Sequence, residues 1–309
     1  MGTVAVIMAT YNGGNYVRQQ LESILASSFC DFEIFIYDDG SKDNTISIIR
    51  ELQEQYPSKI YLHQNEQNLG VTRNFLQALA NSTADYIMLC DQDDVWKKDK
   101  IAKTLKRMKN MESQLGKNIP LAVFTDADIV DENLKIISNS FFKFNKLNPH
   151  KTDLAHILME NKLIGCTVMV NSQVRRLLHN YPLPKHARFH DWWIALISSS
   201  MGKISFIEEA TLLYRQHSGN LVGGSGFAAY LKSRLANIKK QKQALQSLYA
   251  QAEEFLAIYD DILPDESKRQ IREFAALSGM GFMQKRMLIL RKGYTKSGFL
   301  RNLGLMLVV

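Results

Sequence analysis

The sequence predicts an α/β fold: a mostly parallel sheet with helices on both faces, followed by a helical C-terminal extension. Short apolar runs alternate with amphipathic segments through the first half of the chain, and clusters of polar residues follow several of these runs. Beyond about residue 220 the composition becomes strongly basic. Continuous apolar strands separated by amphipathic helices are typical of parallel sheets that are buried on both faces.

The elements of the first half can be placed in order. The apolar runs predict strands at residues 4–8, 33–37, 60–63, 86–90 and 122–125. Helical spacing of apolar residues predicts helices at 15–25, 45–55, 71–81 and 101–111. After residue 121 the order is less regular, and we expect strands at 165–170 and 204–207 around a helix at 190–200.

Composition divides the chain into two parts. Its 309 residues, 46% hydrophobic and 22% charged, are typical of a folded protein with one large domain and an appendage. The net charge of +7 comes entirely from residues 221–309, because residues 1–220 are balanced. A Gly-rich stretch, 219–226, marks the change. We therefore predict a domain at 1–220 that binds a ligand and a basic tail at 221–309.

The tail has two segments with helical spacing of apolar residues. The first is defined by Leu231, Leu235, Ile238, Leu245, Leu248, Ala252, Phe255 and Tyr259. The second, residues 282–309, combines Lys and Arg with Phe, Met and Leu and contains no acidic residue. A basic amphipathic segment suits an anionic membrane surface. The alternative is a helical hairpin that packs on the first domain or on a second subunit of a homodimer.

Three features predict a cytoplasmic protein that is attached to a membrane only peripherally. The chain leads straight into a strand-like run without a signal peptide, and no apolar stretch reaches the ~18 residues needed to span a bilayer. Its three cysteines (Cys30, Cys90 and Cys166) are far apart and form no CxxC pair. They argue for a reducing compartment, and we expect each of them to be buried.

Three carboxylates follow the apolar run at 86–90. Asp91, Asp93 and Asp94 lie within four residues, so their charges repel one another. A divalent ion such as Mg²⁺ or Mn²⁺ would neutralise them, and such ions often share carboxylate oxygens with substrate phosphates. The alternative is a solvated acidic turn that caps the next helix.

Other polar residues follow neighbouring strands, where ligands of parallel sheets bind. Thr10, Tyr11 and Asn12 follow the first strand, and Asp39 follows the second. An aromatic ring beside a carboxylate favours a nucleotide pocket, although each residue alone is more often part of a turn. Arg73 lies on the first turn of a helix whose N-terminus could face an anion, or could simply be capped.

The second half supplies a candidate base and further polar groups. Asp191 opens a helix beside Trp192 and Trp193, and aromatic surroundings can raise the pKa of a carboxylate. The alternative is an N-cap aspartate with core tryptophans. Arg215 and His217 follow the last strand-like run, where they could complete a metal or diphosphate site.

Several common signatures are absent. The sequence contains no GxGxxG, no GxxxxGK[ST] and no GxSxG, which argues against dinucleotide oxidoreductases, P-loop NTPases and α/β-hydrolases. A nucleotidyltransferase remains an alternative, but such enzymes usually carry a basic loop after the first strand, and residues 10–15 contain no Lys or Arg. A non-catalytic carbohydrate- or membrane-binding module is a third alternative, which the intact Asp93 and Asp191 disfavour.

Six segments of the chain form a recognisable set of motifs: VIMATYN (6–12), YDDGSKDNT (37–45), NLGVTRN (68–74), DQDD (91–94), HDWW (190–193) and YRQHSGN (214–220). The first four resemble the family 2 inverting glycosyltransferases with the GT-A fold, a Rossmann-like sheet with flanking helices, and the resemblance covers about residues 3–220. A less specific likeness, in HDWW and YRQHSGN, is to bacterial rhamnosyltransferases, especially streptococcal enzymes that build rhamnose-rich polysaccharides.

The resemblance implies roles for individual residues. Tyr11 would stack on the base and Asp39 would bind it, with Asp191 as the catalytic base. Asp91 and Asp93 would form the DxD element, with Asp93 or Asp94 on the metal ion. Many family members have Glu before the catalytic Asp, where this chain has His190, and the QxxRW element of processive enzymes is missing.

The resemblance also implies substrates. The donor would be a nucleoside-diphosphate sugar, with dTDP-β-L-rhamnose the first choice and a UDP-hexose the alternative. The acceptor would be a hydroxyl of a polyprenyl-diphosphate-linked saccharide at the inner membrane face, in cell-wall polysaccharide synthesis. Mn²⁺ or Mg²⁺ would be the cofactor, one or a few sugars would be added, and no nucleic acid would be bound.

Overall fold

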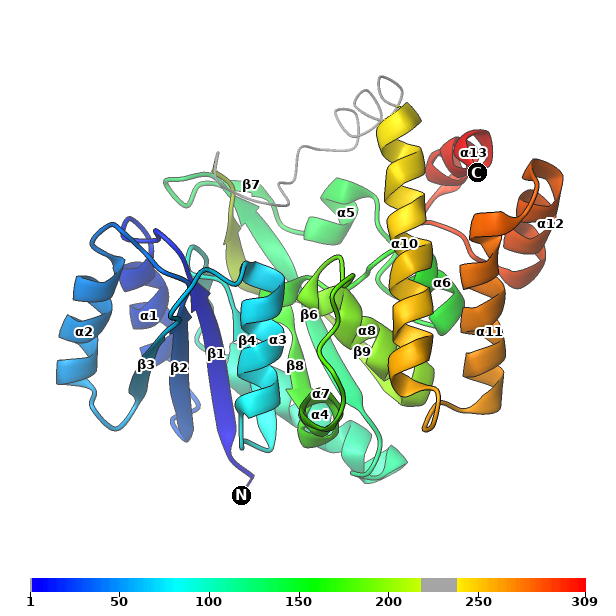
Figure 1. The fold of residues 1–309 in the computed structure, drawn as a ribbon. Coiled ribbons are helices and arrows are strands. Elements are labelled where there is room, and N and C mark those ends of the chain that lie inside the picture. Colours follow the sequence, from blue (N-terminus) through cyan, green and yellow to red (C-terminus); the bar gives the residue numbers. More distant parts are fainter. Residues whose placement is uncertain (1, 218–237) are drawn as a thin grey trace.

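The computed structural model, which describes residues 2–217 and 238–309, shows a mixed β-sheet with helices on both faces (Figure 1). Within these residues the sheet has nine strands, in the order β3-β2-β1-β4-β8-β6-β9-β5, with β7 beside β6. The strands are β1 (Val4–Thr10), β2 (Phe32–Asp38), β3 (Ile60–Gln64), β4 (Tyr86–Cys90), β5 (Val95–Trp96), β6 (Leu121–Val130), β7 (Ile136–Ser138), β8 (Met169–Asn171) and β9 (Lys203–Arg215).

The helices cover the sheet and extend beyond it. Those of residues 2–217 are α1 (Val17–Leu25), α2 (Thr45–Gln55), α3 (Val71–Asn81), α4 (Lys100–Leu115), α5 (Phe141–Asn145), α6 (Leu154–Met159), α7 (Ser172–Asn180) and α8 (His190–Met201), with the 3₁₀ turn η1 (Gly165–Thr167). The tail contains α10 (Ile238–Tyr259), α11 (Asp265–Ala276), the 3₁₀ turn η2 (Leu277–Gly279), α12 (Phe282–Lys292) and α13 (Phe299–Val308).

The first four strands form the parallel part of the sheet. β1 pairs in parallel with both β2 and β4, and β2 pairs in parallel with β3. Alternate residues of β1 point into opposite cores: Ile7 packs with α3, and Val6 packs with α1, α2 and α4. The predicted fold class is confirmed here, and α2 and α3 have the predicted bounds.

The second half departs from a simple parallel sheet. β8 pairs antiparallel with both β4 and β6, and β5 pairs antiparallel with β9. The predicted strand at 165–170 is wrong in part, because residues 165–167 form η1 and the strand covers Met169–Asn171. Apolar sequence alone does not distinguish a buried turn from a strand. Cys90 and Cys166 are buried as expected, but Cys30 is exposed, so that expectation is wrong.

Of the tail helices, α10 and α11 pack against α6 and α8, and all four contribute buried residues to the same core (Figure 1). The rings of Trp193 on α8 and Phe255 on α10 have centroids 5.1 Å apart. The buried Lys162 donates to Glu160 and to Ser297, the latter in the loop before α13. Leu231, Leu235 and the predicted boundary at 220/221 lie outside the described residues. Among the residues described, no helix is long and apolar enough to cross a membrane.

Candidate functional site

A cavity of about 720 Å³ lies at the carboxyl ends of β1, β2 and β4, and the start of α8 also lines it. It brings together residues that are far apart in the sequence. The predicted site residues among those that line it are Thr10, Tyr11, Asp39, Asp91, Asp93, Asp191 and Trp192. Asn12, Arg73, Asp94, Arg215 and His217 are not among its lining residues.

The loop after β1 is held against residues 91–94 after β4, which we call the acidic loop. The Tyr11 backbone N–H donates to Gln92 Oε1 over 2.9 Å, and Gln92 Nε2 donates back to the Tyr11 carbonyl over 3.1 Å. The Asn12 side chain instead accepts from the Lys42 backbone N–H over 2.8 Å. With its backbone fixed in this way, the Tyr11 ring remains 51% exposed at the cavity, where it could stack on a planar ligand.

Asp39 is buried and organises the loop before α3. Its Oδ1 accepts from the backbone N–H of Leu69 over 2.7 Å, and its Oδ2 accepts from Gly70 over 2.8 Å. Gly70 has a φ of +76°, a backbone conformation that favours glycine. The carboxylate thus shapes the N-terminus of α3 at the cavity wall. Arg73, one turn into this helix, is exposed.

Asp93 and His217 face each other across the acidic loop. His217 Nε2 lies 2.8 Å from Asp93 Oδ2, and the His217 ring stacks on Tyr16 with centroids 4.8 Å apart. Asp93 lines the cavity, whereas His217 contacts Asp93 without lining the cavity itself. A carboxylate oxygen and an imidazole nitrogen already side by side are suitable donors for a divalent ion.

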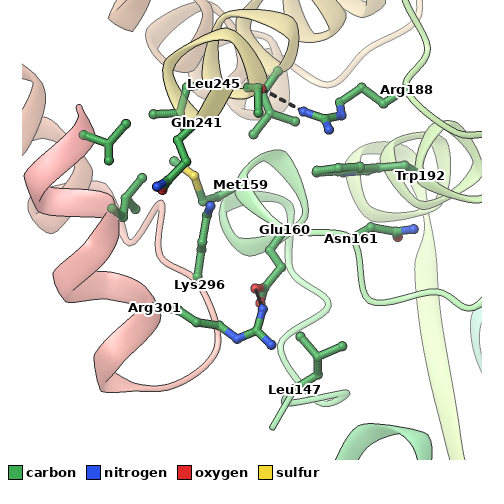
Figure 2. Close-up of a pocket in the computed structure, with 14 residues that line it drawn as sticks. Leu147, Met159, Glu160, Asn161, Arg188, Trp192, Gln241, Leu245, Lys296 and Arg301 are labelled. Carbon is green, nitrogen blue, oxygen red and sulfur yellow. Dashed lines mark hydrogen bonds and ion pairs between the residues drawn. The ribbon is translucent and has the colours of Figure 1, made fainter. Parts of the chain in front are cut away.

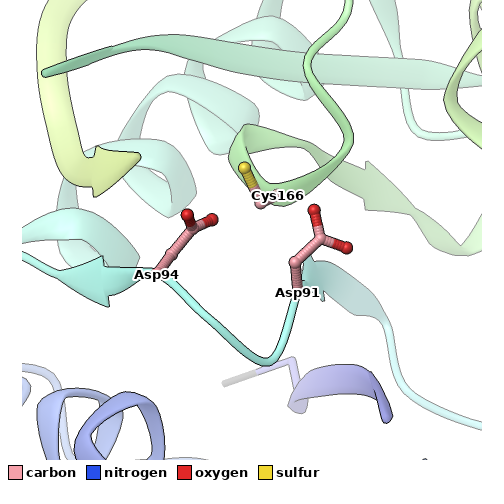
Figure 3. Close-up of side chains that lie close together, drawn as sticks. All are labelled: Asp91, Asp94 and Cys166. Atoms are coloured by element: carbon pink, nitrogen blue, oxygen red, sulfur yellow. The ribbon is translucent and has the colours of Figure 1, made fainter. Parts of the chain in front are cut away.

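A second cluster consists of Asp91, Asp94 and Cys166 (Figure 3). One ligand atom of each residue lies within 4.8 Å of the others. Burial and the neighbouring carboxylates raise the pKa of Asp91 and Asp94, and burial raises the pKa of the Cys166 thiol. Because Mg²⁺ and Mn²⁺ prefer oxygen to a protonated thiol, Asp91 and Asp94 are the donors of this cluster that fit such an ion, and Asp93 and His217 offer a further pair of donors.

Arg215 is fixed below the acidic loop. Its side chain donates to the backbone carbonyls of Asp93 and Glu132, and its backbone N–H donates to Asp94 Oδ1 over 3.2 Å. The residue is 3% exposed. These contacts hold the end of β9 to the acidic loop, so Arg215 positions that loop from a place outside the cavity lining.

Asp191 also lines the cavity, from the first turn of α8. Burial raises its pKa from 3.8 to about 7, although hydrogen bonds from the backbone N–H of Trp192 and the Asn161 side chain act in the other direction. Its Oδ1 is buried without a hydrogen-bond partner. A carboxylate with a pKa close to neutrality and an unused oxygen at a cavity can accept a proton.

Three neighbours surround Asp191: Gly165, His190 and Trp192. A Cβ on Gly165 would lie 2.8 Å from His190 Nε2, so only glycine leaves room for the His190 ring, and it would lie 3.7 Å from an Asp191 oxygen, an ordinary contact distance. Burial lowers the pKa of His190 to about 3, and its neutral ring stacks on Phe75 with centroids 4.1 Å apart. Trp192 is anchored by donating from Nε1 to the Ile157 carbonyl over 2.7 Å.

Sequence reasoning missed several residues of this cavity. No role was predicted for Gln92, which lies between Asp91 and Asp93 in the sequence. Asn161, Lys162 and Gly165 belong to a segment without a recognisable motif. Lys162 is a fully buried cation at the cavity, paired with Glu160. An isolated Lys-x-x-Gly gives no signal in a sequence, because its role depends on α8 and on the tail.

The cavity combines an exposed aromatic ring, a cluster of carboxylates and a buried carboxylate with a raised pKa, which are groups that an enzyme for group transfer could use. The model of the family "Glycosyl transferase family 2" matches residues 5–149. The chain belongs to this glycosyltransferase family, and the predicted resemblance is confirmed.

Relatives with similar sequences support the assignment. A protein named dTDP-rhamnosyl transferase RfbG, from Shigella flexneri, is 30% identical over 71% of this chain and 74% of its own length. A protein of Nostoc sp., named an uncharacterized glycosyltransferase, is also 30% identical, over 70% of this chain and 66% of its own length.

Solved structures share the fold. The TarS structure from S. aureus in complex with UDP-GlcNAc has a TM-score of 0.56 and 17% identity, covering 94% of this chain and 73% of that one. The mannosyltransferase PcManGT from Pyrobaculum calidifontis, in complex with GDP-Man and Mn²⁺, has a TM-score of 0.55 and 17% identity, covering 99% and 84%. At this identity the likeness supports the α/β architecture alone.

Proposed function

We propose that this glycosyltransferase moves one sugar from a nucleoside-diphosphate donor to an acceptor hydroxyl, with inversion and with Asp191 as the base. The observation that carries the proposal is that Asp191, Tyr11 and Asp93 line one cavity. A donor bound at Tyr11 and Asp93 and an acceptor bound at Asp191 would meet in this cavity, which suits a direct displacement between two bound substrates.

The reaction follows from these positions. The acceptor hydroxyl gives its proton to Asp191, and its oxygen forms a bond to the anomeric carbon. The bond from that carbon to the diphosphate breaks on the opposite side, and the electron pair leaves with the diphosphate. A β-linked donor therefore gives an α-linked product. Trp192, which is almost fully buried, helps to keep water away from the base.

Asp93, Asp94 and His217 would hold a divalent cation, either Mn²⁺ or Mg²⁺, with Asp91 close to Asp94. When bound, this cation would neutralise charge on the departing diphosphate. The chain's own contribution is to hold Asp93 next to His217, while Arg215 and Gln92 fix the acidic loop to which Asp93 belongs.

dTDP-β-L-rhamnose is the donor we propose first. The support is the 30% identity with a relative whose name gives dTDP-rhamnosyl transfer. A UDP-hexose is the alternative, because the family fold also occurs in a structure that contains UDP-GlcNAc. A nucleotidyltransferase is a more distant alternative.

For the acceptor we propose a polyprenyl-diphosphate-linked saccharide of cell-wall polysaccharide synthesis at the inner membrane face. Eight of the fifteen large apolar side chains that are exposed among the described residues lie on α12 and α13, including Phe299 at 78% and Leu307 at 67%. Lys and Arg accompany them. An exposed apolar patch with basic residues suits peripheral binding to anionic lipid, or alternatively a homodimer.

The direct test measures nucleoside-diphosphate release from dTDP-rhamnose, UDP-glucose, UDP-galactose and UDP-N-acetylglucosamine, with and without Mn²⁺ or Mg²⁺. We expect metal-dependent release from dTDP-rhamnose. Release from a UDP-sugar alone would show that the donor is that UDP-sugar and not dTDP-rhamnose, and the proposed sugar transfer would still hold. If synthetic lipid-linked acceptors and the full donor panel gave no release at all, the proposed transfer would be refuted.

A further inference from the structure

A second cavity, of about 230 Å³, lies between the first domain and the tail (Figure 2). Its walls come from α6, from the segment that precedes α8, and from α10 and α13. Leu245 of α10 and Leu305 of α13 belong to its apolar part. Arg188, Lys296 and Arg301 are its cationic residues.

This cavity adjoins the reaction site on the side of the base. Leu147, Asn161 and Trp192 line both cavities. Trp192 follows Asp191 directly, and the Asn161 side chain lies near enough to Asp191 to lower its pKa. In contrast, Tyr11, Asp39 and Asp93 line only the first cavity. An acceptor whose hydroxyl lies at Asp191 can therefore extend into the second cavity without crossing the donor.

The charges of the second cavity favour an anion. Three cationic residues line it against one carboxylate, Glu160. That carboxylate is already engaged by the buried Lys162 and lies 3.5 Å from Arg301. Arg188 is held in place by donating from Nη1 to the Ala244 carbonyl and to Ser247, with its guanidinium carbon 5.5 Å from the centre of the Trp192 ring. Fixed guanidinium groups are well suited to phosphate oxygens.

The remaining wall favours an apolar chain next to that anion. Leu305 and Val308 of α13 face the cavity, while Leu303 and Leu307 of the same helix are exposed. α13 therefore separates the cavity from the exposed apolar surface of the tail. A ligand with an anionic group and an attached hydrocarbon chain matches both the cations and the apolar wall.

We propose that this cavity is the acceptor subsite for the diphosphate and the first isoprene carbons of a lipid-linked saccharide. This inference rests on the proposed function, since it assigns the acceptor side of the same site. It makes the tail a part of acceptor recognition, with Lys296 and Arg301 binding the diphosphate and Arg188 positioned opposite them.

A binding measurement with the full chain tests the subsite without turnover. Geranyl diphosphate is titrated with the donor site saturated by dTDP and no metal present, and geraniol and inorganic diphosphate serve as comparison ligands. We expect saturable binding of geranyl diphosphate that Lys296→Gln weakens about tenfold, the size expected for one lost charge-assisted contact. Lys296→Arg should restore binding. Lys106→Gln, the same change at an exposed position on α4, should have no effect.

Kinetics then separate this inference from the proposed transfer. With a diphosphate-linked acceptor, Lys296→Gln should raise KM about tenfold more than with the same saccharide on a neutral alkyl chain. Equal binding of geraniol and geranyl diphosphate, or equal KM changes for the two acceptors, would overturn the subsite even if transfer is observed. Binding with the expected pattern but no transfer would instead count against the proposed function.

Discussion

The two walls of the reaction cavity are built in different ways. On the donor wall, which the loops after β1, β2 and β4 form, polar side chains hold backbone groups: Asp39 fixes Leu69 and Gly70, and Gln92 fixes Tyr11. On the acceptor wall, which the start of α8 forms, Asp191 depends on packing, with Trp192 beside it and with Gly165 leaving space for the neighbouring His190. The donor wall comes from short consecutive segments, whereas the acceptor wall requires η1, α6, α8 and the tail.

This difference has a chemical reason. A nucleoside diphosphate presents the same polar groups whichever sugar it carries, so fixed hydrogen-bonding loops can recognise it. The base must work on the other wall, where burial shifts its pKa and excludes water. Packing supplies that environment without needing a short sequence pattern. Mutations on the two walls should therefore separate binding of the donor from the chemical step.

The largest expected effect is that of Asp191→Asn. The amide cannot accept the proton of the acceptor hydroxyl, so kcat should fall by about 10²–10⁴. The Kd of the donor should change little, because the donor wall remains intact. Steady-state kinetics and titration with the donor measure both quantities. Asp31→Asn, the same change at an exposed position, is the control, and an Asp191→Asn enzyme with normal kcat would remove the base assignment.

The pH dependence of kcat is the second test of the acceptor wall. With the pKa of Asp191 raised to about 7, the base is protonated below that pH, so kcat should fall about tenfold for each pH unit below it. At pH 5 the loss should be about hundredfold. The pKa of Asp91 is also raised to about 7, so the residual activity of Asp191→Asn should keep only the part of this pH dependence that Asp91 causes. A wild-type rate independent of pH between 5 and 7 would contradict the assignment.

The same shift also affects folding. The pKa of Asp191 in the folded chain lies above the ordinary value of 3.8. Proton binding to this group therefore stabilises the folded state fully below pH 3.8, and that contribution is lost as the pH rises through about 7. The rate thus increases over the same pH interval in which this one contribution to stability decreases.

Changes at the donor wall should alter metal dependence. His217→Ala removes the imidazole nitrogen that lies beside Asp93, so the concentration of Mn²⁺ needed for half-maximal activity should rise about 10–100-fold. A titration of activity with Mn²⁺ measures this change, and saturating metal should recover much of the rate. His63→Ala, at an exposed position on β3, is the control. An unchanged metal requirement would exclude His217 as a ligand.

The same contrast explains how much could be predicted from sequence. The parallel strands β1–β4 and the helices between them were predictable, because each strand is a buried apolar run and each helix has one apolar face. Tyr11, Asp39 and Asp93 were predictable for a related reason, since they directly follow those strands. Asp191 stood out because two tryptophans follow it.

The remaining features depend on contacts between distant segments. β8 is a strand of three residues between β4 and β6, too short to give a periodic signal. Lys162 lines the cavity because Glu160 and Ser297, separated by 137 residues, surround it. The Asp93–His217 pair could be anticipated only as a set of candidate ligands, because β9 must return beside β6 before His217 reaches the acidic loop.

The smallest expected effect concerns the exposed face of α13 and binding to membranes. Leu307→Asp places a charge on a side chain that is 67% exposed and touches no part of the reaction cavity. If α13 inserts this residue into lipid, losing a Leu contact worth about 1.5–3 kcal/mol should reduce partitioning at least tenfold. Flotation with vesicles containing anionic lipid measures the bound fraction. Ile136→Asp, a similar change on β7, should leave binding unaltered, and equal flotation of both variants and the unmodified chain would assign the apolar face of α13 to another partner.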